Sequence, residues 1–185
     1  MGRSCMLPAS QTRTLAAIVV DYQQRYAPGA DAERDYFRKF RSLRAAIHAA
    51  ASATNSDGKR FAHQRRLPRR VLQQVSLELL AAAPAVRAAH TFAGLFQVID
   101  DTLRPIHGVG ELMVYDTALR LGAYRGVAPG HVYLHAGTRV GARALGLDSA
   151  RQSITVSELP SQLRRLRPDQ IEDVLCIYKR DLAQF

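Results

Sequence analysis

The most informative stretch of this chain is Ile106-His-Gly-Val-Gly-Glu-Leu-Met-Val-Tyr-Asp-Thr-Ala-Leu-Arg-Leu-Gly122. An apolar segment precedes it, a tight Gly-x-Gly turn follows at Gly108–Gly110, and a second helical pattern begins at once. Both glycines permit positive φ and a close approach of the backbone to a ligand. The first amides of the second helix have no acceptors within it, and its dipole favours an anion there. The stretch therefore predicts two helices joined by a hairpin that is suited to binding a phosphate.

Apolar residues recur at helical spacing on both sides of this hairpin. We expect helices over residues 10–26, 31–52, 68–83, 84–90, 91–103, 111–122, 132–145, 157–166 and from 169 onward. Ser10, Asp31 and Thr91 are the expected N-caps, and Ala27-Pro-Gly-Ala30 is expected to end the first helix. Strand-like alternation is confined to Ser153–Val156. The sequence therefore predicts an all-α, irregular helical bundle that contains a helix-hairpin-helix motif.

The length of 185 residues fits one domain. We expect a flexible leader over 1–9 and a single all-helical domain over 10–185, with the hairpin core at about 92–147. No apolar run is long enough for a membrane span or a secretory signal, which predicts a cytoplasmic protein without a membrane partner. Cys5 and Cys176 are far apart and have no metal-ligating neighbours at short spacing, so we expect free thiols, no metal site and no cofactor.

The net charge of +10 favours a polyanionic partner. Nearly all of the basic residues are arginines, whose planar forks bind phosphate in bidentate fashion. Positive charge is concentrated in an irregular loop after the Asn55–Gly58 turn. The members of this predicted phosphate-contacting loop are Lys59, Arg60, His63, Gln64, Arg65 and Arg66. The alternative interpretation is a loop that is basic only for solubility.

The hairpin resembles the helix-hairpin-helix motif of the DNA glycosylase superfamily. The likeness rests on Ile106-x-Gly-Val-Gly110, on Val127-Ala-Pro129 and on Val132-Tyr-Leu-His-Ala-Gly-Thr-Arg-Val-Gly-Ala-Arg-Ala-Leu-Gly146. It covers roughly residues 92–147. The chain is more similar still to bacterial proteins of no established activity that share a Gly-Glu-Leu…Tyr-Asp…His-Ala-Gly-Thr pattern and end in Glu-Asp-x-Leu-Cys.

The resemblance implies that Gly108, Val109 and Gly110 grip a nucleic-acid backbone. The catalytic residues of the superfamily do not carry over. Its aspartate falls at Tyr133, and the lysine of its bifunctional members falls near Leu112. Glu111 suits the helix dipole but competes with a phosphate for the same amides.

Three other polar residues are candidates for chemistry, namely Asp116, His135 and Glu172. Asp116 either pairs with Arg120 at i,i+4 or faces His135 across a pocket. His135, four residues before Arg139, is either structural or a general acid or base. Arg139 is a further candidate for binding nucleic acid. A two-metal cluster of Asp116, Glu172 and Asp173 lacks a supporting sequence motif.

Three functions remain open from the sequence. The first is a nucleic-acid-binding module, with DNA as the expected partner, on a glycosylase-like core. The second is a DNA-processing enzyme of glycosylase or lyase type that uses Asp116, His135 and Glu172. The third is a helical module that binds a protein partner. The enzyme hypothesis requires that Asp116, His135 and Arg139 converge in one cleft.

Overall fold

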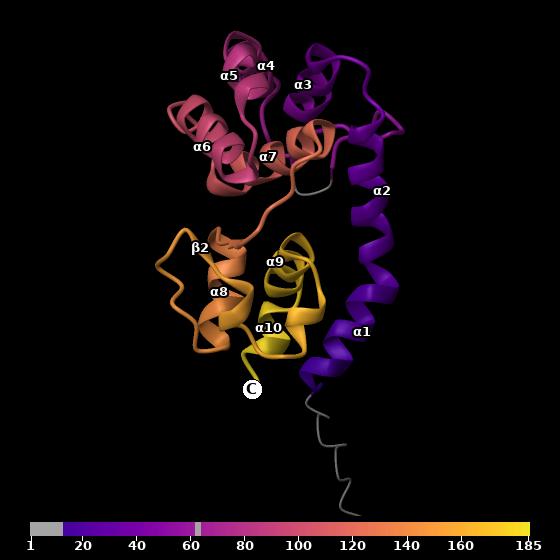
Figure 1. Cartoon of the computed structure of the whole chain (residues 1–185), viewed down its shortest axis with the longest axis vertical. Helices are drawn as coiled ribbons and strands as arrows, with labels where there is room; N and C mark the ends of the chain where they lie inside the picture. The colour runs from indigo at the N-terminus through magenta and orange to yellow at the C-terminus, as the bar shows by residue number, and fades with distance from the viewer. Residues whose placement is uncertain (1–12, 62–63) are drawn as a thin grey trace, which may run out of the picture.

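The computed structural model describes residues 13–61 and 64–185, and these form an all-α, irregular helical bundle (Figure 1). The helices are α1 (Leu15–Arg25), α2 (Ala27–Arg38), α3 (Leu43–Ser52), α4 (Arg69–Ala81), α5 (Ala83–Ala88), α6 (Phe92–Leu103), α7 (Glu111–Arg125), α8 (Ala136–Ala144), α9 (Pro168–Ile177) and α10 (Lys179–Leu182). Two 3-10 turns cover Val156–Glu158 and Leu163–Arg165. Strands β1 (Val132–Tyr133) and β2 (Ser153–Ile154) pair antiparallel, with Val132 opposite Ile154. The fold class predicted from the sequence is confirmed.

The buried side chains form two separate cores, which divide the molecule into two lobes (Figure 1). The first lobe contains α2 to α7 and is centred on residues such as Phe37, Leu95 and Leu121. The second lobe contains α1, α8, α9, α10 and the two-stranded ribbon. Because α1 packs against α9, segments from both ends of the chain share the second lobe. Among the described residues, no helix is both long and apolar enough to cross a bilayer.

The expected helix boundaries were wrong at the start of α2. The first helix ends close to the expected position, since α1 stops at Arg25, but the second helix was expected to begin after Asp31 and α2 begins at Ala27. Pro28 occupies the first turn, where an amide hydrogen has no partner in the helix and its loss costs nothing. Asp31 therefore does not cap a helix, and its carboxylate instead pairs with Arg34 and Arg167. The expected helix over 31–52 also divides, because Ser42 caps a new helix by accepting from the Ala45 amide.

Other predictions of helix caps and boundaries agree better with the structure. Thr91 caps α6 by accepting from the Gly94 amide, as predicted. The N-cap of α1 is Thr14, while the expected cap Ser10 lies outside the described residues. The alternation at Ser153–Val156 forms β2 in part. The helix expected from Val132 starts only at Ala136, because Val132 and Tyr133 pair with β2.

Helices α6 and α7 pack against each other and are joined by a turn over 104–110, called the hairpin turn below. Gly108 has φ of 92°, which is unfavourable for residues with a side chain. The Val109 amide donates to the Ile106 carbonyl, which closes the turn. Gly110 is extended and is the N-cap of α7, and no side chain among the described residues caps that helix end.

Helices α8 and α9 approach each other unusually closely through two glycines. A Cβ on Gly137 would lie 2.6 Å from Cys176 Sγ, and one on Gly141 would overlap the Leu175 carbonyl. The two glycines, four residues apart, therefore let α9 lie directly on α8. This packing places the start of α8 beside the middle of α9.

Candidate functional site

A buried histidine–carboxylate pair lies where the two lobes meet. His135 is the N-cap of α8, and its amide donates to Thr138 Oγ1 at 2.6 Å. Its Nε2 is hydrogen-bonded to Oε1 of Glu172 on α9. Only 3% of the His135 side chain and 7% of the Glu172 side chain are exposed. The structure thus joins two of the predicted candidates that are far apart in sequence.

Burial sets the charge of this pair. Loss of hydration lowers the pKa of His135, against the opposing effect of the Asp116 and Glu111 carboxylates. Burial raises the pKa of Glu172 well above its usual value, and the nearby Asp173 and Asp116 carboxylates raise it further. Both shifts favour the uncharged forms. Burial therefore favours a pair that carries no net charge.

Asp116, on α7, faces this pair from the first lobe and is held by a polar network. Its Oδ2 accepts from Gln64 Nε2 at 3.0 Å and lies 3.9 Å from Arg120 Nη2. Arg120 also donates to Gln64 at 2.9 Å and to Glu33 at 2.8 Å. The predicted Asp116–Arg120 pair is therefore present. Gln64, expected in a phosphate-contacting loop, is only 3% exposed and belongs to this buried network instead.

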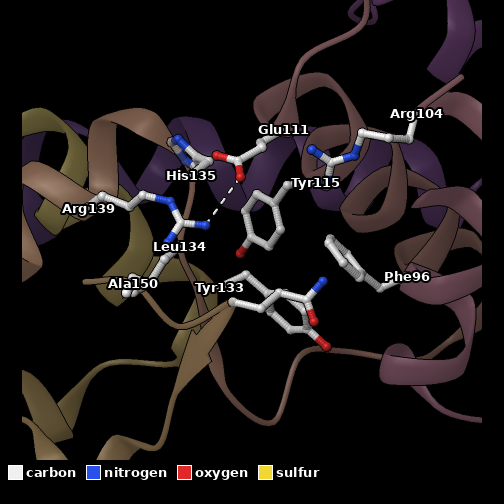
Figure 2. A pocket seen from close by; sticks show the side chains of 10 residues that line it. Phe96, Arg104, Glu111, Tyr115, Tyr133, Leu134, His135, Arg139 and Ala150 are labelled. Atoms are coloured by element: carbon white, nitrogen blue, oxygen red, sulfur yellow. Dashed lines mark hydrogen bonds and ion pairs between the residues drawn. The ribbon is translucent and has the colours of Figure 1, made fainter. Parts of the chain in front are cut away.

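Two cavities lie on either side of the His135–Glu172 pair. The first, of about 170 Å³, is lined by His135 together with Tyr115, Tyr133 and Arg139 (Figure 2). The second, of about 140 Å³, is lined by Glu172 together with Asp116, Asp173, Glu33 and Arg120. Asp116 and Glu172 therefore share one cavity, while His135 and Arg139 share the other. The convergence of Asp116, His135 and Arg139 in one cleft, which the enzyme hypothesis requires, is therefore not met, and only the His135–Glu172 hydrogen bond links the two cavities.

The first cavity has an aromatic wall with an unsatisfied hydroxyl. The ring centroids of Phe96 and Tyr133 are 4.4 Å apart, and those of Tyr115 and Tyr133 are 5.8 Å apart. Tyr115 is only 1% exposed, and its hydroxyl has no hydrogen-bond partner among the described residues. Figure 2 shows this hydroxyl pointing among the side chains that line the cavity. A buried hydroxyl without a partner is costly, which indicates that a ligand or water completes it.

The second cavity contains a further buried carboxylate, Asp173 of α9. Burial raises its pKa to about 6, while the hydrogen bond from Tyr22 acts to lower it. The Tyr22 hydroxyl donates to Asp173 Oδ2 at 2.7 Å. From the sequence, Asp173 was considered only as a member of a two-metal cluster with Asp116 and Glu172. The structure places it beside Glu172, where its negative charge adds to that of Asp116.

Arg139, expected to bind nucleic acid, is held within the protein by three acceptors. Its Nη1 donates to the carbonyls of Ser149 and Arg151 at 2.7 and 2.8 Å, and its Nη2 lies 3.2 Å from Glu111 Oε1. The guanidinium therefore compensates the Glu111 charge at the start of α7. Glu111 was expected to compete with a phosphate, and this ion pair weakens that competition.

The hairpin turn lies against the first turn of α4. A Cβ on Gly108 would be 3.5 Å from Val71 Cγ2. The residues just before Val71, Arg69 and Arg70, are exposed. They extend the predicted basic loop into a basic segment over residues 59–70 that contains no aspartate or glutamate. The loop predicted from the sequence ends at Arg66 and includes neither arginine, although no acidic residue occurs before either of them in this segment.

The predicted loop residues have different surroundings. Lys59, Arg65 and Arg66 are exposed, whereas the half-buried Arg60 donates from Nη1 to the Leu67 carbonyl at 2.9 Å. His63 lies outside the described residues. The exposed members, with Arg69 and Arg70, therefore carry the solvent-facing positive charge, and Arg60 fixes the path of the loop.

One group of side chains has the donor types of a metal site. An imidazole nitrogen of His135, a carboxylate oxygen of Glu172 and Cys176 Sγ all lie within 4.8 Å of one another. No metal site was predicted from the sequence, since no histidine or second cysteine lies near Cys176 along the chain. His135 comes from a different helix, which short spacing cannot reveal.

Comparison with known proteins does not indicate a function, so the function is inferred from the geometry. No family model matches the chain, and neither a curated protein nor a solved structure matches it. The two features that invite a functional interpretation are the basic surface beside the hairpin turn and the buried polar site between the lobes.

Proposed function

We propose that the protein binds nucleic acid, and DNA in particular, through the hairpin turn and the basic segment. The observation that carries this proposal is the packing of Gly108 on Val71. It puts the hairpin turn against the first turn of α4, in which Arg69 and Arg70 are exposed. Backbone amides and arginines together are the groups that proteins use to contact phosphates.

The start of α7 supports the same proposal. Its N-cap is a glycine in extended conformation, so backbone rather than a capping side chain faces outward. Because α7 has 15 residues, the positive end of its helix dipole lies at this N-terminus. The one carboxylate in its first turn, Glu111, is already paired with Arg139. The site is therefore chemically suited to an anion.

The variant Gly110→Val tests the proposal. A Cβ at Gly110 meets no atom within 4 Å, so the free protein has room for the new side chain. A bound phosphate would meet that side chain, and we expect the affinity for a DNA duplex to fall about tenfold, or ~1.4 kcal/mol. Fluorescence anisotropy measures the affinity, and thermal unfolding checks the fold.

The matched control is Gly29→Val, at an exposed glycine of α2 whose added Cβ also meets no atom within 4 Å. This variant should bind DNA as the unmodified protein does. If Gly110→Val and Gly29→Val bind DNA equally well, the hairpin turn has only a structural role and the proposal is wrong.

A second candidate function is an enzyme that acts on nucleic acid in the region between the lobes. The observation that favours it is the buried His135–Glu172 pair between the aromatic cavity and the acidic cavity. A histidine and a protonated carboxyl group with opposed pKa shifts are suited to proton transfer near neutral pH. Asp116 would add a negative charge that stabilises a developing cation.

The enzyme candidate is tested with oligonucleotides that carry uracil, alkylated purines, oxidised bases or abasic sites. If one of them is converted, Glu172→Gln and Asp116→Asn should each lower the single-turnover rate about 100-fold or more. DNA affinity should stay within about twofold, because neither residue lies at the hairpin turn. Conversion that survives both substitutions would contradict this assignment of residues.

A further inference from the structure

We propose that His135, Glu172 and Cys176 bind one divalent transition-metal ion of the zinc class. This inference goes beyond DNA binding and does not depend on it, because the three residues lie away from the hairpin turn. It concerns the buried site between the lobes and gives that site a cofactor.

The geometry brings three different donor atoms together. The imidazole, carboxylate and thiol donors lie within 4.8 Å of one another, a spacing that a single ion can close with small side-chain movements. Glu172 and Cys176 are four residues apart on α9 and therefore project from one face of that helix. His135 reaches them from the start of α8. Donors from two packed elements fix a site more firmly than donors from one loop.

The donor set selects the class of metal. Zinc binds histidine nitrogen, cysteine sulfur and carboxylate oxygen, whereas magnesium and calcium require oxygen ligands. The sulfur of Cys176 therefore argues against both of those ions. Three protein ligands leave one position of a tetrahedral ion open, which is the arrangement of catalytic rather than structural zinc sites.

The close packing of α8 on α9 lets the Cys176 sulfur approach His135. Gly137 has no room for a Cβ because Cys176 Sγ would lie 2.6 Å from it. The glycine therefore allows the sulfur to reach the first turn of α8, beside His135. The Thr138 hydroxyl accepts from the His135 amide at 2.6 Å and fixes the backbone that carries the imidazole. Ligands that are held by surrounding groups in this way bind metals with less loss of freedom.

The surroundings also favour a cation. Asp116 and Asp173 line one cavity together with Glu172, so carboxylate groups surround a site that is largely closed to solvent. Buried charges of one sign are stabilised by a bound counter-ion. The Tyr115 hydroxyl, which has no hydrogen-bond partner among the described residues, belongs to a side chain that lines the adjoining cavity. Its ring centroid lies 6.0 Å from that of His135.

Cobalt titration of the full chain tests the proposal. The titration uses Cys5→Ser protein, so that any sulfur ligand is Cys176. We expect one equivalent of Co²⁺ to bind, with a near-ultraviolet thiolate-to-cobalt absorption band and the intense visible bands of four-coordinate cobalt. One equivalent of Zn²⁺ should abolish both signals. Excess Zn²⁺, at ~100 times its dissociation constant, should raise the Tm of the metal-free protein by about 5 °C or more.

Substitutions assign the ligands. Cys176→Ser should abolish the near-ultraviolet band, and His135→Gln should weaken cobalt binding at least about tenfold, since an outer-shell change alone costs about that much. His131→Gln, at an exposed histidine close by in sequence, is the matched control and should bind cobalt normally. Far-ultraviolet circular dichroism confirms that each variant is folded.

Two results would overturn the proposal. The first is a folded protein that binds no cobalt or zinc at micromolar concentrations. The second is a cobalt spectrum that Cys176→Ser leaves unchanged. Affinity for DNA is measured in parallel with chelator present, so that loss of the metal site and loss of the DNA site are seen separately.

Discussion

At the scale of single residues, Tyr133 and Leu112 stand where the resemblance to DNA glycosylases places an aspartate and a lysine. Tyr133 is 7% exposed and packs on Phe96, and burial raises the pKa of its hydroxyl. Leu112 has no amine. Neither residue can therefore stabilise a sugar cation by charge or form a Schiff base.

We predict that the protein forms no Schiff base with a damaged strand. Oligonucleotides that carry oxidised bases or abasic sites are incubated with the protein and borohydride, which traps such an adduct covalently. No trapped complex is expected above the background of a heat-denatured sample. A trapped complex would show that an amine elsewhere in the chain acts as the nucleophile, and the residue assignment would fail.

Glu158 gives a prediction on pH. It accepts from the Thr155 amide at 2.7 Å and pairs with Arg151, and these hydrogen bonds lower its pKa to about 2. Because the pKa of an unfolded glutamate is ~4.3, the folded state gains stability from the ionised form above that pH. This gain is lost as the pH falls from the unfolded value through the folded one.

The measurement compares the Tm of the unmodified protein with that of Glu158→Gln from pH 6 to pH 2. The variant should have the lower Tm at pH 6, and the difference should shrink toward zero at pH 2. A constant difference across this range would mean that the carboxylate charge does not stabilise the turn.

At the scale of secondary-structure elements, the contact between α8 and α9 depends on Gly141. A Cβ there would overlap the Leu175 carbonyl, which is backbone and cannot move independently of α9. We predict that Gly141→Ala lowers the free energy of unfolding by about 1–3 kcal/mol, the usual cost of overpacking. In an isolated helix the same change would stabilise. Urea unfolding measures the effect, and an unaltered or higher stability would contradict the observed helix approach.

The sequence predicted most of the helices but not all of their boundaries, nor the pairing of the two short strands. Thr91 and the apolar stripe of α6 identify that helix without reference to the rest of the chain. The stretch with Pro28 was correctly expected to follow the end of the first helix, but proline is also tolerated in a first turn, and α2 begins there directly. Val132 and Tyr133 were assigned to a helix because their pairing with residues 153–154 is non-local. Local patterns do not report such pairings.

At the scale of the whole molecule, the candidate site depends on contacts between elements: His135 and Glu172 meet within the second lobe, and Asp116 reaches Glu172 from the first. Asp116, His135 and Glu172 were each identified as candidates by residue type, yet nothing in their spacing indicated that His135 and Glu172 form a buried pair. Cys176 is a free thiol, as predicted, but its closeness to His135 was not predicted, since it depends on the packing of α8 on α9. The candidate residues could therefore be named from the sequence, but the contacts between helices that bring them together could not be predicted.

If the basic segment and the hairpin turn bind DNA phosphates, the affinity for DNA must fall as the salt concentration rises. With ~4 to 6 phosphate contacts, a plot of log affinity against log salt concentration should have a slope of roughly −4 to −5 for a duplex. Changing Arg69 and Arg70 together to alanine should reduce the magnitude of the slope by about 2. The control, with the same loss of charge, changes Arg25 and Arg38 to alanine on α1 and α2 and should leave the slope nearly unchanged. A flat salt response, or no binding at low salt, would contradict the account and favour a helical module that binds a protein partner.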